Sequence, residues 1–180
     1  MSDVMQAIRE RRSIRKYESK AVPDEALSDV LDALRWAQSW ANTQCWEVVV
    51  VRDAEVKKAL QQTLPEGNPS FAAIVEAPVV LALCAKLGSA GYFKGAPVSP
   101  FGDWFLFDLG IATQNIALAA HTHGLASVVV GLLNHDKAKA VLNVPEGYEL
   151  ATLMPLGYPV QEASPPQRRD VSAFTHYDGF

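Results

Sequence analysis

DWFLFDLGIATQNIALAAHTH, residues 103–123, has the spacing of one long helix, and its side chains are apolar on nearly every face. A helix without a polar face must be buried all round. The chain has 180 residues, the size of one domain, in which a single layer of neighbours leaves one side of such a helix in water. The stretch therefore predicts a central helix whose second side is covered by another subunit.

Shorter helices and strands surround this stretch without regular alternation. Helical spacing and caps predict helices at 3–12, where Asp3 and Gln6 form a capping box, at 23–38, at 53–64 and at 134–142. Short apolar, β-branched runs predict strands at 46–51, 78–85, 127–133 and 150–156. Residues 87–102 are rich in Gly, Pro and Ser and predict a loop that covers a pocket. We therefore expect a single α+β domain over 1–180, with a mixed sheet packed on the long central helix.

Composition and charge exclude several functional classes. The chain carries 16 basic and 20 acidic residues, so its net charge of −4 is the wrong sign for a nucleic-acid partner. Its two cysteines, Cys45 and Cys84, do not form a disulfide framework or a zinc-ligand pattern. No leader peptide and no apolar run of about 18 residues is visible. We expect a cytoplasmic protein without a membrane or a metal ion as partner.

Basic residues cluster just after the first predicted helix, where Arg11, Arg12 and Arg15 flank the Ser13 hydroxyl. Guanidinium groups bind phosphate in a bidentate manner, so the cluster is a candidate anion site. The alternative is that these arginines only complement the helix dipole. Arg168 and Arg169 pose the same question near the C-terminus, where a solvated pair is the alternative.

A second polar group lies between the second predicted helix and the first strand. The segment QSWANTQCW, residues 38–46, places amide and hydroxyl side chains beside two indoles. Carboxamides can read the edge of a planar heterocycle, whereas the alternative is a polar loop anchored by core tryptophans. Glycine-rich nucleotide motifs and an activated nucleophile are absent, and we interpret His121 and His123 as helix-end residues.

Four motifs in order resemble the flavin-dependent nitroreductase family over almost the whole chain. They are RRSIRKY at 11–17, SWANTQCW at 39–46, the block 110–131 with Gln114-Asn115 and Gly124-Leu125, and Arg168-Arg169. The resemblance implies an intertwined homodimer with one FMN at each of two subunit interfaces. It also implies reduction by NADH or NADPH and ping-pong transfer to nitroaromatic, quinone or similar electron-poor acceptors.

The resemblance also implies roles for individual residues. Arg11 and Arg169 would hold the FMN phosphate, with Arg12 and Ser13 beside them. Arg15, near the N1 and C2 carbonyl edge, would stabilise the anionic reduced ring. The remaining contacts would be Gln38, Ser39, Trp40 and Asn42 of the partner subunit and the backbone of Val130, Gly131 and Leu132 near N5.

Some positions depart from the family pattern. Cys45 and Gln38 replace prolines, and Gln167 stands where a basic residue is usual, so Arg168 is expected to compensate. Ser70 is the nearest candidate for a polar flavin contact before the 78–85 strand. Two alternatives to the reductase remain: a flavin storage or sensing protein, and another chemistry of the superfamily such as flavin fragmentation, dehalogenation or oxidation of peptide heterocycles.

Overall fold

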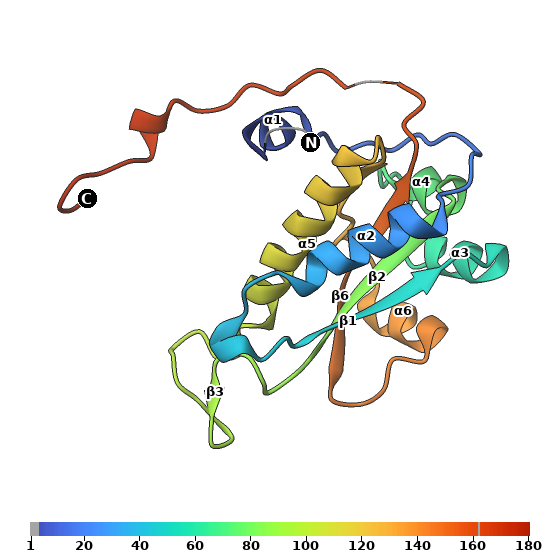
Figure 1. Ribbon diagram of the computed structural model, residues 1–180. Coiled ribbons are helices and arrows are strands. Elements are labelled where there is room, and N and C mark those ends of the chain that lie inside the picture. The colour runs from blue at the N-terminus through green and yellow to red at the C-terminus, as the bar shows by residue number, and fades with distance from the viewer. Residues whose placement is uncertain (1–3, 162) are drawn as a thin grey trace.

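A four-stranded sheet lies between two layers of helices in the computed structural model, which describes residues 4–161 and 163–180 (Figure 1). The strands follow the order β1 (Trp46–Val51), β2 (Val79–Lys86), β6 (Tyr148–Gly157) and β5 (Ala126–Ser127). All three strand pairs are antiparallel, and an isolated parallel bridge joins Ser13 to Ser127. The α+β class is confirmed, and the mixed character of the sheet comes from this bridge alone among the described pairings.

Alternate residues of β2 belong to two separate cores. Val79, Leu81 and Leu83 pack with helices α2 (Asp24–Arg35) and α5 (Phe105–Thr122). Val80, Ala82 and Cys84 face the other way, toward the cluster that includes residues of α3 (Ala54–Gln61), α4 (Phe71–Glu76) and α6 (His135–Leu142). Because both faces of this strand are buried, its sequence is apolar without alternation. The central position predicted for residues 78–85 is confirmed by their pairing with both β1 and β6.

The long helix α5 has one buried and one open side in the single chain. Leu109, Ala112 and Ile116 are buried against the sheet and α2. Leu106 and Phe107 on another side are 62% and 59% exposed and border a shallow groove of α5 residues. The predicted central helix is therefore confirmed, and its open apolar side is what a subunit contact would cover.

Helix ends differ from the predictions by a few residues. Helix α1 spans Val4–Glu10, and its predicted Asp3 cap lies outside the described residues. Helix α2 ends at Arg35 rather than at residue 38, because the chain then leaves the helical conformation and leads into the short helix η1 (Trp40–Asn42). Asp53 and Asn134 cap α3 and α6 through hydrogen bonds to backbone amides, as expected. Helix α4 was not predicted, since six residues are too few to show a helical period.

The strand predicted at 127–133 is wrong beyond its first residue. Only Ala126–Ser127 forms β5, and the following segment forms one isolated backbone bridge with the sheet among the described residues, between Val130 and Leu153. Val129 and Leu132 are 53% and 69% exposed, so their apolar character does not reflect burial in a sheet. An apolar run with exposed members points instead to a surface that contacts something else.

Two further segments lie at the edges of the fold. The predicted 87–102 loop contains a small hairpin, β3 (Tyr92–Phe93) with β4 (Ala96–Pro97). The described tail residues 163–180 run in an extended path away from the sheet and include the short helix η2 (Val171–Ala173) (Figure 1). Within the described ranges, no helix combines the length and hydropathy that a membrane crossing requires.

Candidate functional site

The arginines that follow α1 are half-buried and incompletely paired. Arg12 donates from Nη1 to the carbonyl oxygens of Arg9 at 2.6 Å and Arg11 at 2.8 Å. The Nε atoms of Arg11 and Arg12 are buried and have no hydrogen-bond partner in the described part of the chain. Burial, together with the like charges of Arg12 and Arg168, lowers the pKa of Arg11. A bound anion would accept hydrogen bonds from these unpaired guanidinium donors and would offset the repulsion between the like charges.

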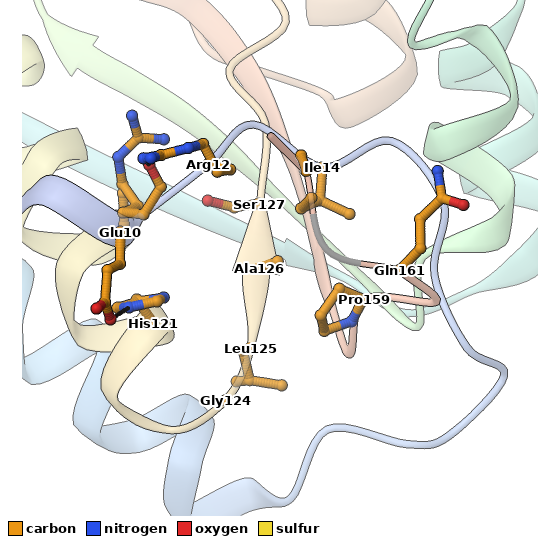
Figure 2. Close-up of a pocket in the computed structure, with 13 residues that line it drawn as sticks. Glu10, Arg12, Ile14, His121, Gly124, Leu125, Ala126, Ser127, Pro159 and Gln161 are labelled. Atoms are coloured by element: carbon orange, nitrogen blue, oxygen red, sulfur yellow. Dashed lines mark hydrogen bonds and ion pairs between the residues drawn. The ribbon is translucent and has the colours of Figure 1, made fainter. Parts of the chain in front are cut away.

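These arginines border a cavity of about 530 Å³, a volume usual for small-ligand sites. Figure 2 shows Glu10 and His121 on one side of it, and Pro159 and Gln161 on the other. His121 Nε2 lies 3.8 Å from Glu10 Oε2, which places the end of α5 beside the end of α1. Ser127 also lines the cavity, and its carbonyl accepts from the Ile14 amide at 3.1 Å. The first sequence motif and the end of the long helix therefore meet at one cavity.

The two arginines of the tail have different surroundings. Arg168 lies close enough to Arg11 to act on its pKa. Arg169 instead donates from Nη2 to the Ala173 carbonyl and lies 5.7 Å from the centre of the Phe174 ring. In the single chain the structure thus brings Arg168, rather than Arg169, to the arginine cluster.

Arg15 belongs to a chain of hydrogen bonds that crosses the site. Its Nε donates to Ser70 Oγ at 3.2 Å, and Ser70 is 4% exposed. The Ser70 amide donates to Asn68 Oδ1 at 2.8 Å, and Asn68 Nδ2 donates to the Leu132 carbonyl at 3.1 Å. Ser13 is exposed and lines a smaller pocket beside Arg15. Asn68 was not identified from the sequence; its only signal there is an Asn in a GNPS turn.

The backbone carbonyls of residues 130–132 lie within hydrogen-bond distance of side chains from other segments. Val130 O accepts from Thr152 Oγ1 at 2.8 Å, and His135 Nε2 lies 3.3 Å from Gly131 O. The Leu132 carbonyl accepts from Asn68 Nδ2. The amides of Gly131 and Leu132 have no partner among residues 4–161 and 163–180, and both residues are exposed. Two neighbouring N–H groups are therefore available to an acceptor on a ligand.

The loop that carries Gln38, Ser39, Trp40 and Asn42 lies at the opposite end of α5 from the arginines. Helix α5 has 18 residues, which corresponds to roughly 27 Å at 1.5 Å per residue. Gln38, Ser39 and Trp40 line a separate pocket of about 210 Å³ with residues of the first turns of α5. The structure therefore does not bring this loop and the arginine cluster together within one chain.

A buried carboxylate fixes that loop. Asp108 is 1% exposed and accepts from the Trp40 amide at 3.1 Å and 3.0 Å through its two oxygens. Burial raises the pKa of Asp108. Burial and then the nearby Asp108 charge raise the pKa of the Cys45 thiol to about 12, so Cys45 is not an activated nucleophile. Trp40 packs on Trp104 with ring centres 5.2 Å apart, and this indole does anchor the loop, as the alternative interpretation expected.

The loop nevertheless adopts an unusual backbone. Ala41, Asn42 and Gln44 have positive φ angles of 44°, 57° and 48°. Left-handed conformations of non-glycine residues cost energy and gather at ligand sites. A loop that served only to connect two elements has no need of three such residues.

Histidines and acidic residues form no metal centre in the part of the chain that the structure describes. His121 and His123 lie at the end of α5 as predicted, and His123 Nε2 is 3.2 Å from Asp29 Oδ2.

Comparisons of the sequence and the structure with known proteins all find members of one protein family or flavin reductases similar to it. A model of the Nitroreductase family matches residues 8–158. A candidate NADH dehydrogenase/NAD(P)H nitroreductase of Methanothermobacter thermautotrophicus is 32% identical over 173 residues, covering 94% of this chain and 82% of the relative. The FMN reductase [NAD(P)H] of Bacillus subtilis is 27% identical over 191 residues, covering 100% of this chain and 75% of the relative. The structure of the NADPH:FMN oxidoreductase of Vibrio harveyi in complex with NAD+ superposes with a TM-score of 0.83 at 25% identity, covering 99% and 78% of the two chains.

Proposed function

The chain belongs to the nitroreductase family, and from this premise we propose that it is an FMN-dependent NAD(P)H oxidoreductase. The observation that carries the proposal is the cluster of Arg11, Arg12 and Arg168, with two buried Nε atoms that have no partner in the described residues of this acidic chain. The proposed enzyme is a cytoplasmic homodimer that reduces nitroaromatics, quinones or similar electron-poor compounds by a ping-pong mechanism.

The arginine cluster suits the phosphate of FMN. A phosphate offers several acceptor oxygens and a charge that offsets the like charges of Arg11, Arg12 and Arg168. Arg169 lies on the exposed tail, and it would join the phosphate after giving up its bond to the Ala173 carbonyl.

Groups on the other side of the first motif suit the flavin ring. When bound, FMN accepts a hydride from NADH or NADPH and passes the electrons to the second substrate. Arg15, held by Ser70, supplies a positive charge for the N1 and C2 carbonyl edge, where it stabilises negative charge. The free amides of Gly131 and Leu132 supply donors for the N5 region, and the exposed Leu132 side chain lies beside them.

A homodimer supplies the parts of the site that one chain leaves apart. The open side of α5 offers Leu106 and Phe107 as apolar contact surface. If two copies pack with this side shared, the loop with Gln38, Ser39, Trp40 and Asn42 of the partner subunit reaches the arginine end of the first chain. The site is then complete only in the dimer.

Aromatic side chains near the hairpin favour flat acceptors. Phe101 is 78% exposed, and its ring centre lies 5.9 Å from that of Trp104 in an edge-on arrangement. The Trp104 Nε1 donates to Ser99 Oγ at 2.6 Å, which fixes the indole in place. Such rings stack on planar electron-poor compounds, so changes in the 87–102 segment are expected to alter acceptor preference more than FMN affinity.

Steady-state kinetics test this function. In a ping-pong reaction NAD(P)H and the acceptor use one pocket in turn, so double-reciprocal plots at several quinone concentrations are expected to be parallel. Intersecting lines would contradict the mechanism. A yellow protein that binds FMN without turnover over a panel of quinones and nitroarenes would support a storage or sensing protein instead.

A further inference from the structure

Asn68 connects two parts of the site that are far apart in sequence. Its side chain accepts from the Ser70 amide and donates to the Leu132 carbonyl, and Ser70 in turn accepts from Arg15. We propose that Asn68 is a positioning residue, which sets the Arg15 charge and the amide donors after Val130 in one arrangement toward the flavin ring. The inference rests on the proposed function, because it concerns the same FMN.

The backbone around Asn68 is fixed independently of its side chain. The Asn68 amide donates to Pro65 O at 3.1 Å, and the Asn68 carbonyl accepts from the Phe71 amide at 2.9 Å. The carboxamide is thus free to use both its acceptor and its donor on other segments. An apolar or purely accepting side chain at this position would lose one or both of these links.

The link from Asn68 to the Leu132 carbonyl fixes the end of the segment that carries the free amides of Gly131 and Leu132. In a planar trans peptide the C=O and the following N–H point in opposite directions. The Val130 carbonyl accepts from Thr152 Oγ1 and from the Leu153 amide, and His135 Nε2 lies within hydrogen-bond distance of the Gly131 carbonyl. Asn68 Nδ2 donates to the Leu132 carbonyl. The amides that follow these carbonyls have no partner within the described ranges, so they are directed away from the groups that hold the carbonyls. Of the three side chains, only Asn68 also has a hydrogen-bonded route to Arg15 in the structure.

This arrangement favours the reduced form of the cofactor. A positive charge and oriented N–H groups interact more strongly with a ring that has gained negative charge than with a neutral one. Loss of Asn68 is therefore expected to weaken binding of reduced FMN more than binding of oxidised FMN. We expect the ratio of the two affinities to fall about tenfold, which lowers the reduction potential of bound FMN by about 30 mV for a two-electron couple.

The test compares Asn68→Ala with Gln61→Ala. Gln61 is the matched control, because its Nε2 donates to the Phe71 carbonyl at 2.9 Å in the same connection without a bond to Arg15 or Leu132. In the flavin-free chain, Asn68→Ala is expected to shift the NMR signals of the Leu132 and Leu133 amides, and Gln61→Ala to leave them in place. In the FMN-loaded protein, Asn68→Ala is expected to lower the potential and Gln61→Ala to leave it unchanged.

A second variant guards against a general loss of structure. Asn68→Asp keeps the acceptor for the Ser70 amide but removes the donor to Leu132, so in the flavin-free chain it is expected to fold and to shift the NMR signals of the Leu132 and Leu133 amides. The added carboxylate lowers the potential by its charge alone, so this variant is compared by its NMR signals and not by its potential. A role confined to stability would weaken the binding of oxidised and reduced FMN equally and leave the potential of Asn68→Ala at the wild-type value, which would overturn the assignment. A wild-type chain that binds no FMN would overturn the proposed function itself, and the two failures are thereby distinguished.

Discussion

Replacing Arg11 by alanine removes a group that is unfavourable in the free chain and favourable in the complex. Its half-buried guanidinium has an Nε without a partner in the described residues and lies near the like charges of Arg12 and Arg168. A charge-assisted hydrogen bond contributes about 1.5–3 kcal/mol. At about 1.4 kcal/mol per decade, Arg11→Ala is expected to weaken FMN binding roughly ten- to hundredfold.

Titration of the flavin-free chain with FMN, followed by flavin fluorescence, measures this loss. Arg9→Ala is the matched control, because Arg9 is an exposed arginine two positions earlier on α1. The control is expected to keep the wild-type affinity. Urea unfolding should show that flavin-free Arg11→Ala is at least as stable as wild type, since repulsion is relieved. Unchanged FMN affinity, or weaker binding explained by an unstable variant, would refute the reasoning.

Three further outcomes follow from the same structure. Wild type is expected to sediment at about twice 19.6 kDa and Phe107→Asp nearer to one chain, and an unaltered dimer would exclude α5 from the interface. Arg15→Ala should slow flavin reduction by NADH about 10²-fold in stopped-flow mixing, and an unchanged rate would remove its electrostatic role. Burial raises the pKa of Asp108, so the folded chain binds this proton more tightly than the unfolded one. Wild type should therefore lose stability relative to Asp108→Asn as pH rises from the ordinary carboxyl pKa to the raised one. A stability difference independent of pH in urea titrations would contradict this.

The elements that were predictable from sequence are those whose burial leaves a pattern. Strand β2 is buried on both faces and α5 is apolar on most sides, so both appear as long apolar runs. The segment after Ser127 has a similar composition without forming a strand beyond that residue: Val128, Val130 and Leu133 are buried in the second core, whereas Val129 and Leu132 are exposed. Local composition does not distinguish these two situations.

The site was predictable in its residue types and only partly in its contacts. Arg11, Arg12 and Arg15 stand out as a basic cluster in an acidic chain. Asn68 does not, because its role depends on a turn that places it beside Leu132, 64 positions later. The preference of the cluster for Arg168 over Arg169 depends on the path of the tail, which a pair of adjacent arginines does not reveal.

The most direct test of the central claim is anaerobic mixing of the FMN-loaded chain with NADH and, separately, with NADPH. We predict that the flavin band at roughly 450 nm bleaches with at least one of the two reductants and returns when a quinone or nitroarene is added. A band that persists with both reductants would show that the chain binds flavin without acting as an NAD(P)H oxidoreductase.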